Sequence, residues 1–228
     1  MMTRFFRVVL TILGVAAIPA AAHAYTITLT DWTSGNFAAN AAGGGGPFRA
    51  TTTGGALGTS EFMTFCIEYN EHFNYGVTYN FTLSNGAVNS VVSGGNPDPM
   101  SDATKWLYYQ AVSGGYSSWY PTEISALDSN VGANFQYAIW LLEGERTLGE
   151  IGGTGSAGDL LAQYAGSQDW GSLYAQGHRV YAMNLTTANG GPVQDQLAYT
   201  APVPEPGSLL LFGTGLVGGL RAWRKRRG

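Results

Sequence analysis

The residues of this chain that can react with one another are a cysteine and a glutamine seventy positions apart. Cys66 is the only cysteine among the 228 residues and lies in the stretch FCIEY. Gln136 lies in the segment SNVGANFQYAIWLLEGE, residues 129–145, which reads as a helix. A thiol held against a glutamine carboxamide can attack it and expel ammonia. The product is an internal thioester, an electrophile that an amine or a hydroxyl can open.

The strand pattern around Cys66 predicts where its side chain points. In EFMTFCIEYN, residues 61–70, a period of two gives one apolar face: Met63, Phe65, Ile67 and Tyr69. Cys66 shares the more polar face with Glu68, which is unusual for a cysteine that serves only as a small hydrophobic residue. Glu68 and His72 are candidates for assisting proton movement, although Glu68 is equally compatible with a solvated strand residue.

The helix pattern around Gln136 predicts a gap beneath its side chain. The core stripe of the helix is formed by Val131, Phe135, Ile139 and Leu142. Gln136 flanks this stripe, and Gly132 and Ala133 lie one turn before it, on the side towards which helical side chains lean. We expect the Cys66 strand to approach through this gap. The alternative is a buried free cysteine and an ordinary helical glutamine.

These two segments resemble the thioester domains of bacterial surface adhesins, the TQXA-type family. The matching motifs are FCIE, residues 65–68, and QYAIW, residues 136–140, with an intervening helix-like segment TKWLYYQA, and the resemblance spans about residues 60–145. It implies a cross-link between Cys66 and Gln136, with packing residues Ala138, Ile139 and Trp140. Phe135 departs from the pattern, because the family usually has threonine before the glutamine.

The first 24 residues predict a secretory signal peptide. Arg4 and Arg7 provide the positive start, VVLTILGVAA is the apolar stretch, and Ala22-His23-Ala24 is a cleavage site. We therefore expect the mature chain to begin at Tyr25. An uncleaved membrane anchor is the alternative.

The last 26 residues predict a temporary membrane anchor. The triplet Pro204-Glu205-Pro206 is extended, and an apolar run, residues 209–220, follows it as a hydrophobic helix. This run is shorter than the roughly 20 residues of a stable transmembrane helix. The basic residues that would stop transfer are Arg221, Arg224, Lys225, Arg226 and Arg227.

This tail resembles the PEP-CTERM sorting signal of Gram-negative bacteria. The resemblance implies an exosortase as partner, transient anchoring in the inner membrane, and a final location on the cell surface or in the extracellular matrix. An ordinary short C-terminal helix is the alternative.

The charge of the body disfavours polyanionic partners. Residues 25–203 carry four basic and fourteen acidic side chains, a formal charge of −10, which repels nucleic acid and anionic lipid. His72 and His178 show no metal-ligand spacing, so neither a metal nor a cofactor is expected. Glu143 and Glu145 are expected to be solvated acids at a helix end. A secreted hydrolase that uses Glu68 or Glu143 ranks third, because no catalytic constellation is visible.

The pattern of elements predicts one β-rich α+β domain, residues 25–200, between the signal helix and the C-terminal segment 201–228. We expect an antiparallel sheet or barrel with packed helices near 101–112, 130–144 and 159–164. Strands are predicted at 25–29, 61–70, 179–185 and 193–200, with a hairpin that turns at Asn85-Gly86. The glycine-rich stretch 34–60 is predicted to be a loop or a poorly ordered hairpin.

The function that these features favour is covalent capture by a surface adhesion module. Its partner would carry an amine or a hydroxyl. The second interpretation is a non-covalent structural or exopolysaccharide-associated matrix protein without a thioester. The intact mass distinguishes the two, because a thioester makes the chain lighter by one ammonia.

Overall fold

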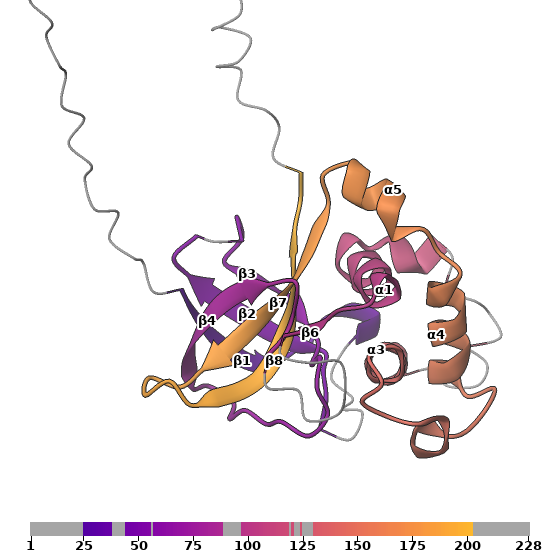
Figure 1. Ribbon diagram of the computed structural model, residues 1–228, viewed down its shortest axis with the longest axis horizontal. Helices are drawn as coiled ribbons and strands as arrows, with labels where there is room; N and C mark the ends of the chain where they lie inside the picture. The colour runs from indigo at the N-terminus through magenta and orange to yellow at the C-terminus, as the bar shows by residue number, and fades with distance from the viewer. Residues whose placement is uncertain are drawn as a thin grey trace, which may run out of the picture.

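The computed structural model describes residues 25–37, 44–55, 57–88, 97–118, 120, 124 and 130–202. In this part of the chain an antiparallel sheet occupies one side of the domain and the helices gather on the other (Figure 1). The fold is therefore a β-rich α+β structure, as the sequence predicts. The predicted signal peptide and hydrophobic tail helix lie outside the described residues.

Six strands form the main sheet, and each pairs antiparallel with its neighbours in the order β3-β2-β1-β4-β7-β8. They are β1 (Thr26–Asp31), β2 (Phe48–Thr53), β3 (Glu61–Thr64), β4 (Thr78–Ser84), β7 (Arg179–Thr186) and β8 (Pro192–Thr200). In β1 the alternation places Ile27 and Leu29 inside, fully buried, between threonines that face outward. A second, two-stranded sheet pairs β5 (Gly86–Ala87) with β6 (Asp98–Pro99).

The two outer strands of the main sheet meet, so the sheet closes on itself just after β3. Leu197 N–H donates to the carbonyl of Phe65, and Ile67 N–H donates to that of Asp195, both at 3.1 Å. Cys66 and Gln196 lie directly opposite each other between these two bonds. In such a pair the side chains approach closely, while the backbone N–H and C=O groups point away from the partner strand. Another element can therefore bind the backbone of Cys66 from its far side.

The helices are α1 (Asp102–Ser113), α3 (Val131–Leu142), α4 (Ala157–Gly166) and α5 (Trp170–Ala175), with short 3-10 turns η1 (Gly35–Phe37), η2 (Gly115–Ser118) and η3 (Leu148–Ile151). Side-chain caps fix where the two central helices begin. The Ser101 hydroxyl accepts from Thr104 N–H at 3.1 Å before α1, and Asn130 Oδ1 accepts from Ala133 N–H at 3.1 Å before α3. The predicted helices near 101–112, 130–144 and 159–164 are confirmed.

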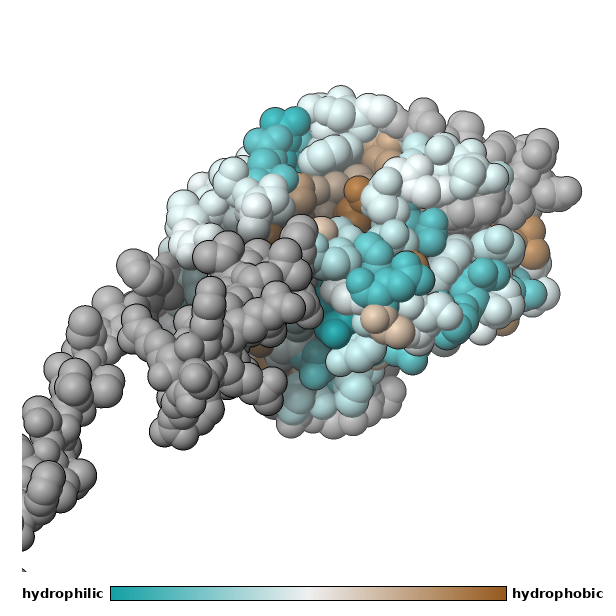
Figure 2. All heavy atoms as spheres, turned by 90° about the horizontal axis from the view of Figure 1, so that it is seen from above, coloured by the Kyte–Doolittle hydropathy of each residue, from teal (hydrophilic) through white to brown (hydrophobic). Residues whose placement is uncertain are grey.

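Helix α3 contributes to both hydrophobic clusters of the domain. Phe135 and Ile139 belong to the cluster between the helices and the sheet. Ala133 and Trp140 belong to the cluster inside the sheet, which also contains Cys66. Gln136 therefore lies where the two clusters meet. On the face seen in Figure 2, hydrophobic surface is concentrated in a hollow, and most of the surrounding described surface is hydrophilic or near neutral.

The structure corrects three predictions about the strands. Residues 34–60 are predicted to be a loop or a poorly ordered hairpin, but residues 48–53 form the strand β2, because threonine and phenylalanine suit a strand whose neighbours β1 and β3 supply its hydrogen bonds. Asn85-Gly86 is not a two-residue hairpin turn, since Gly86 begins β5, which pairs with β6; most of the predicted second arm lies outside the described residues. The strand predicted at 61–70 is shorter: β3 ends at Thr64, and residues 65–67 pair with β8.

The predicted polar face of the Cys66 segment is also wrong. Thr64, Cys66 and Glu68 are as deeply buried as the apolar residues between them. Closure of the sheet covers one face and the helices cover the other. When a strand is buried on both faces, the alternation of apolar and polar residues no longer indicates which face is exposed to solvent.

Within the described residues, no helix combines the length and the apolar character that a membrane crossing requires.

Candidate functional site

The Gln136 carboxamide binds the backbone of Cys66 at both of its polar groups. Gln136 Oε1 accepts from Cys66 N–H at 3.0 Å, and Gln136 Nε2 donates to the Cys66 carbonyl at 2.9 Å. Both residues are fully buried. The side chain of Gln136 thus replaces the strand that would otherwise pair with residue 66 on the side away from β8. The structure brings the predicted pair together.

A glycine segment completes this contact from a third direction. Gly46 N–H donates to the same Gln136 Oε1 at 3.0 Å, so this oxygen receives two backbone N–H groups. A Cβ atom on Gly45 would lie 2.5 Å from the Trp140 ring and 2.6 Å from Gln136 Cγ, closer than carbon atoms pack. Only glycine lets the chain lie this close to the helix.

The predicted gap in α3 exists, but another segment fills it. A Cβ atom on Gly132 would lie 2.6 Å from Pro47, so residues 45–47 approach the helix there. The Cys66 segment was expected in this place. It lies instead on the far side of the Gln136 carboxamide, because its position is fixed by pairing with β8.

The Cys66 thiol is surrounded by hydrogen-bond donors in a dry site. Burial raises the pKa of the thiol to about 12. Three hydrogen-bond donors oppose this increase and lower the pKa. They are Gln196 Nε2, at 3.5 Å from the sulfur, and the backbone N–H groups of Gly46 and Cys66. The two N–H groups that hold Gln136 Oε1 also lower the pKa of the thiol, so the thiol and the carboxamide share these two neighbours.

This arrangement has the elements of an acyl-transfer site. A nucleophile adjoins a carbonyl group whose oxygen is held by two backbone N–H donors at 3.0 Å. Donors at this distance stabilise the negative charge that forms on the oxygen when the carbon is attacked. Because the site is closed to water, the stabilisation is stronger than it would be in solution.

The two residues suggested to assist proton movement differ in position. Glu68 is buried, and its Oε2 accepts from Asp195 N–H at 3.3 Å. Burial, followed by the negative charges of Asp195 and Glu71, raises the pKa of Glu68 to about 9. The carboxyl group therefore holds a proton at neutral pH, and its charge, when present, acts on the thiol. His72 is exposed.

Sequence reasoning missed Gly46 and Gln196. Gly46 belongs to a glycine run that reads as a flexible loop, and only the contact with α3 distinguishes it. A signal for Gln196 does exist, since the three consecutive polar residues Gln194, Asp195 and Gln196 interrupt an otherwise apolar strand. All three are buried. Because neighbouring residues of a strand face opposite sides, three polar residues in a row place at least one in the core and so indicate a buried polar network.

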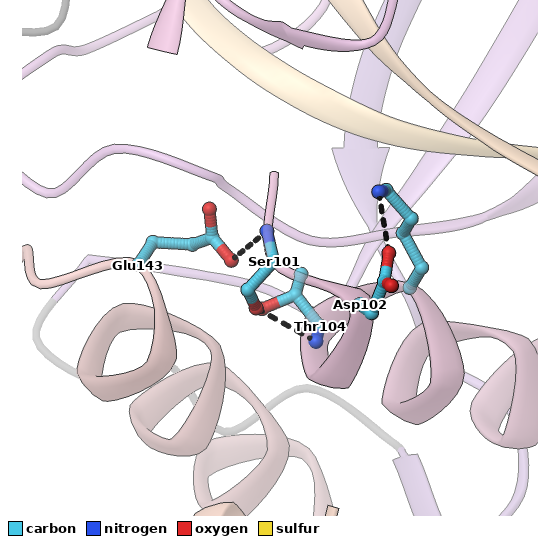
Figure 3. A network of polar contacts seen from close by, with 5 residues as sticks. Ser101, Asp102, Thr104 and Glu143 are labelled. Atoms are coloured by element: carbon cyan, nitrogen blue, oxygen red, sulfur yellow. Dashed lines mark hydrogen bonds and ion pairs between the residues drawn. The ribbon is translucent and has the colours of Figure 1, made fainter. Parts of the chain in front are cut away.

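Glu143 and Glu145 are not the solvated acids that the sequence predicts. A Glu143 carboxylate oxygen accepts from Ser101 N–H at 3.1 Å, at the start of α1 (Figure 3). Burial raises the pKa of Glu143. Glu145 is buried, and its Oε2 accepts from Tyr69 N–H at 3.0 Å. Both carboxylates bind backbone groups of other segments, so they connect the end of α3 to its surroundings.

The described residues contain no group of three or more histidine, cysteine, aspartate or glutamate side chains that could hold a metal ion.

Comparison with known proteins identifies the tail. Residues 202–227 match the family model described as the PEP-CTERM protein-sorting motif. The match implies export, recognition by an exosortase in a membrane-associated sorting step, and delivery to the cell surface. The predicted triplet and basic residues fall within it and lie outside the described residues. No curated protein and no solved structure matches the chain. The resemblance of the body to thioester domains stays a prediction.

Proposed function

We propose that this exported protein is an adhesion module that forms an internal thioester between Cys66 and Gln136. The thioester would capture a surface partner that carries an amine or a hydroxyl. The observation that carries the proposal is the pair of N–H groups, from Gly46 and Cys66, on the Gln136 carboxamide oxygen. A glutamine that served packing alone would not need its carbonyl held beside the only thiol of the chain.

The reaction balances with the groups present. The Cys66 sulfur forms a bond to Gln136 Cδ, the negative charge collects on Oε1 between the two N–H donors, and the Cδ–Nε2 bond breaks. Nitrogen leaves as ammonia and takes the proton of the thiol. Opening by an amine reverses the roles: nitrogen bonds to Cδ, sulfur leaves, and the proton lost by the amine ends on the sulfur.

Glu68 supports proton transfer in this scheme better than His72 does. Glu68 lies two residues from Cys66 on a buried segment and holds a proton at neutral pH. It is therefore suited to relay the proton, giving its own to the departing nitrogen and taking the proton of the thiol in exchange. The exposed imidazole of His72 lacks this burial.

Burial of the site supports a thioester that survives until a partner arrives. Cys66 and Gln136 are fully buried, so water is excluded from the bond. Gly45, packed on Gln136 and Trp140, covers it. A partner would reach the bond by displacing this glycine segment, which is a smaller change than opening the sheet.

Methylamine incorporation tests the proposal. The exported wild-type chain should gain one methylamine, and peptide mapping should place it on Gln136. Cys66→Ala and Gln136→Glu should gain none while they keep the wild-type circular dichroism spectrum. Incorporation at other glutamines, or equal incorporation in the variants, would refute the proposal.

The second candidate, non-covalent ligand binding, is favoured by a cavity beside β3 and α1. This cavity of about 510 Å³ is lined by several aromatic residues, among them Trp32, Phe62, Tyr108, Tyr116 and Tyr199. Its volume lies in the range of small-molecule sites. Flat aromatic faces also suit sugar rings, as the exopolysaccharide interpretation requires. Quenching of tryptophan fluorescence by soluble oligosaccharides that is lost in Trp32→Ala would support this candidate.

A further inference from the structure

Gln196 is a buried polar residue whose position is set by the pairing of β8 with the Cys66 segment, where the sheet closes. It lies on β8 directly opposite Cys66, in the type of antiparallel pair that brings side chains closest together. The bonds on either side, Ile67 N–H to Asp195 and Leu197 N–H to Phe65, fix this register. A shift of one residue would turn Gln196 to the opposite face. The backbone therefore specifies which side chain faces the sulfur.

The contact between Gln196 and the sulfur is a hydrogen bond in a site without water. Gln196 Nε2 donates to Cys66 Sγ at 3.5 Å, and both residues are fully buried. The Oε1 atom of Gln196 has no hydrogen-bond partner among the described residues. A buried amide with one end unsatisfied costs stability, and an apolar residue would fill the site without that cost. The N–H group of this amide faces the sulfur, so we look there for its role.

From this geometry we infer that Gln196 stabilises the Cys66 sulfur as a thiolate, the form in which it attacks Gln136 and in which it leaves when the thioester opens. This inference rests on the proposed function and adds a residue to it. The two backbone N–H groups stabilise charge on the carbonyl oxygen, and Gln196 stabilises charge on the other reacting atom. Hydrogen bonds to ionised acceptors are stronger than those to neutral ones, so the effect falls mainly on the charged states of the reaction.

A glutamine on the same strand provides a matched control. Gln194 is buried like Gln196, but its Nε2 donates to the Glu68 carbonyl at 2.7 Å and not to the sulfur. Gln196→Met and Gln194→Met make the same change in shape and polarity two residues apart. Both remove a buried amide, and only Gln196→Met removes a donor to the sulfur.

The experiment measures the fraction of chains that form the thioester and the rate at which methylamine opens it. Gln196→Met should reduce one or both by about tenfold, the effect of one hydrogen bond to a charged group. Gln194→Met should retain the wild-type values. If Gln196→Met formed and opened the thioester as the wild type does, or if Gln194→Met were equally impaired, the inference would be overturned.

Gln196→Glu gives an independent pH signature. A carboxyl group donates a hydrogen bond to the sulfur when protonated and repels the thiolate when ionised. The opening rate of this variant, divided by that of the wild type at the same pH, should therefore fall as the pH rises. A pH-independent ratio would contradict the inference. If the wild-type chain retained its ammonia, the proposed function itself would fail. Loss of ammonia without any effect of Gln196 would overturn the inference alone.

Discussion

The middle of helix α3 and the turn that follows it use the same structural device with different chemical surroundings. In the middle of the helix, Gln136 binds the backbone N–H groups of Gly46 and Cys66. After its end, Glu143 and Glu145 bind the N–H groups of Ser101 and Tyr69. In each case a buried or half-buried side chain connects a distant segment to the helix. A thiol adjoins the bound group only at Gln136.

The difference teaches that the proposed reaction depends on the group beside a backbone-binding side chain, not on the backbone binding itself. The carboxylates of Glu143 and Glu145 accept N–H bonds and are poor acyl groups. The Gln136 carboxamide accepts comparable bonds, and the residue whose backbone it binds carries the thiol. Under the proposed function, substitutions around Gln136 should therefore change chemistry and stability together, whereas substitutions after the end of α3 should change stability alone.

The largest effect is expected for Gly45→Ala, beside Gln136. The new methyl group would lie 2.5 Å from the Trp140 ring and 2.6 Å from Gln136 Cγ. Such overpacking should lower the free energy of unfolding by about 3 kcal/mol and displace Gln136, so that the thioester fraction also falls. Urea denaturation and intact mass measure the two effects.

Gly149→Ala is the control for that substitution. No atom lies within 4 Å of a Cβ atom at Gly149, so a change of less than about 0.5 kcal/mol is expected. Equal stability of Gly45→Ala and Gly149→Ala would show that the glycine segment does not pack on Gln136.

After the end of the helix, Glu145→Ala should destabilise the domain without affecting the proposed chemistry. It removes a charged hydrogen bond of 3.0 Å to Tyr69 N–H, which should lower the free energy of unfolding by about 2 kcal/mol. Below the melting temperature, methylamine incorporation should equal that of the wild type. Loss of incorporation in the folded variant would break the comparison, because the far end of α3 would then take part in the reaction.

A smaller effect is expected from the buried acids near Cys66. Burial, together with Asp195 and Glu71, raises the pKa of Glu68 from 4.5 to about 9, and burial raises that of Asp195 from 3.8 to about 6. The folded state therefore holds protons that the unfolded state has released. Their contribution to stability is complete below about pH 4 and is lost as the pH rises to about 9.

The free energy of unfolding should accordingly fall between pH 5 and pH 9, and Glu68→Gln should flatten this slope. Denaturation at a series of pH values measures both. A slope that Glu68→Gln leaves unchanged would mean that Glu68 titrates normally in the folded state.

The smallest effect is expected for the ion pair between Lys105 and Asp102 on α1. Its 2.9 Å contact is visible beside the Glu143 contact in Figure 3, but the Asp102 side chain is 71% exposed. Lys105→Met should change the free energy of unfolding by less than about 0.5 kcal/mol and leave methylamine incorporation intact. A loss above about 1 kcal/mol would show that this exposed pair matters as much as the buried carboxylates.

The sequence predicted the helices because their signals are local. Ser101 and Asn130 are capping residues, and the apolar stripe of α3 has helical spacing. The contact between Cys66 and Gln136 was proposed from the lone thiol, the small residues before Gln136 and the motifs FCIE and QYAIW, but the gap at those small residues accommodates Pro47. The identity of the segment in the gap was not predictable, because Gly45 and Pro47 reach the helix only through the packing of β2.

The environment of Cys66 depends on contacts that are distant in the sequence. Its pairing with Gln196 spans 130 residues and closes the sheet. No local sequence pattern indicates that the sheet closes here. The alternation of apolar and polar residues therefore predicted a polar face for Cys66, although that face is buried. The strand β2 was missed for a similar reason, since glycines on both sides of it hide a segment that neighbouring strands hold in place.

The intact mass of the exported chain tests the central claim most directly. If Cys66 and Gln136 form a thioester, the mass is lower than that of the processed sequence by one ammonia, and methylamine raises it by one methylamine. Cys66→Ala has its full calculated mass under both conditions. A wild-type chain that has its full calculated mass before and after methylamine would contradict the thioester.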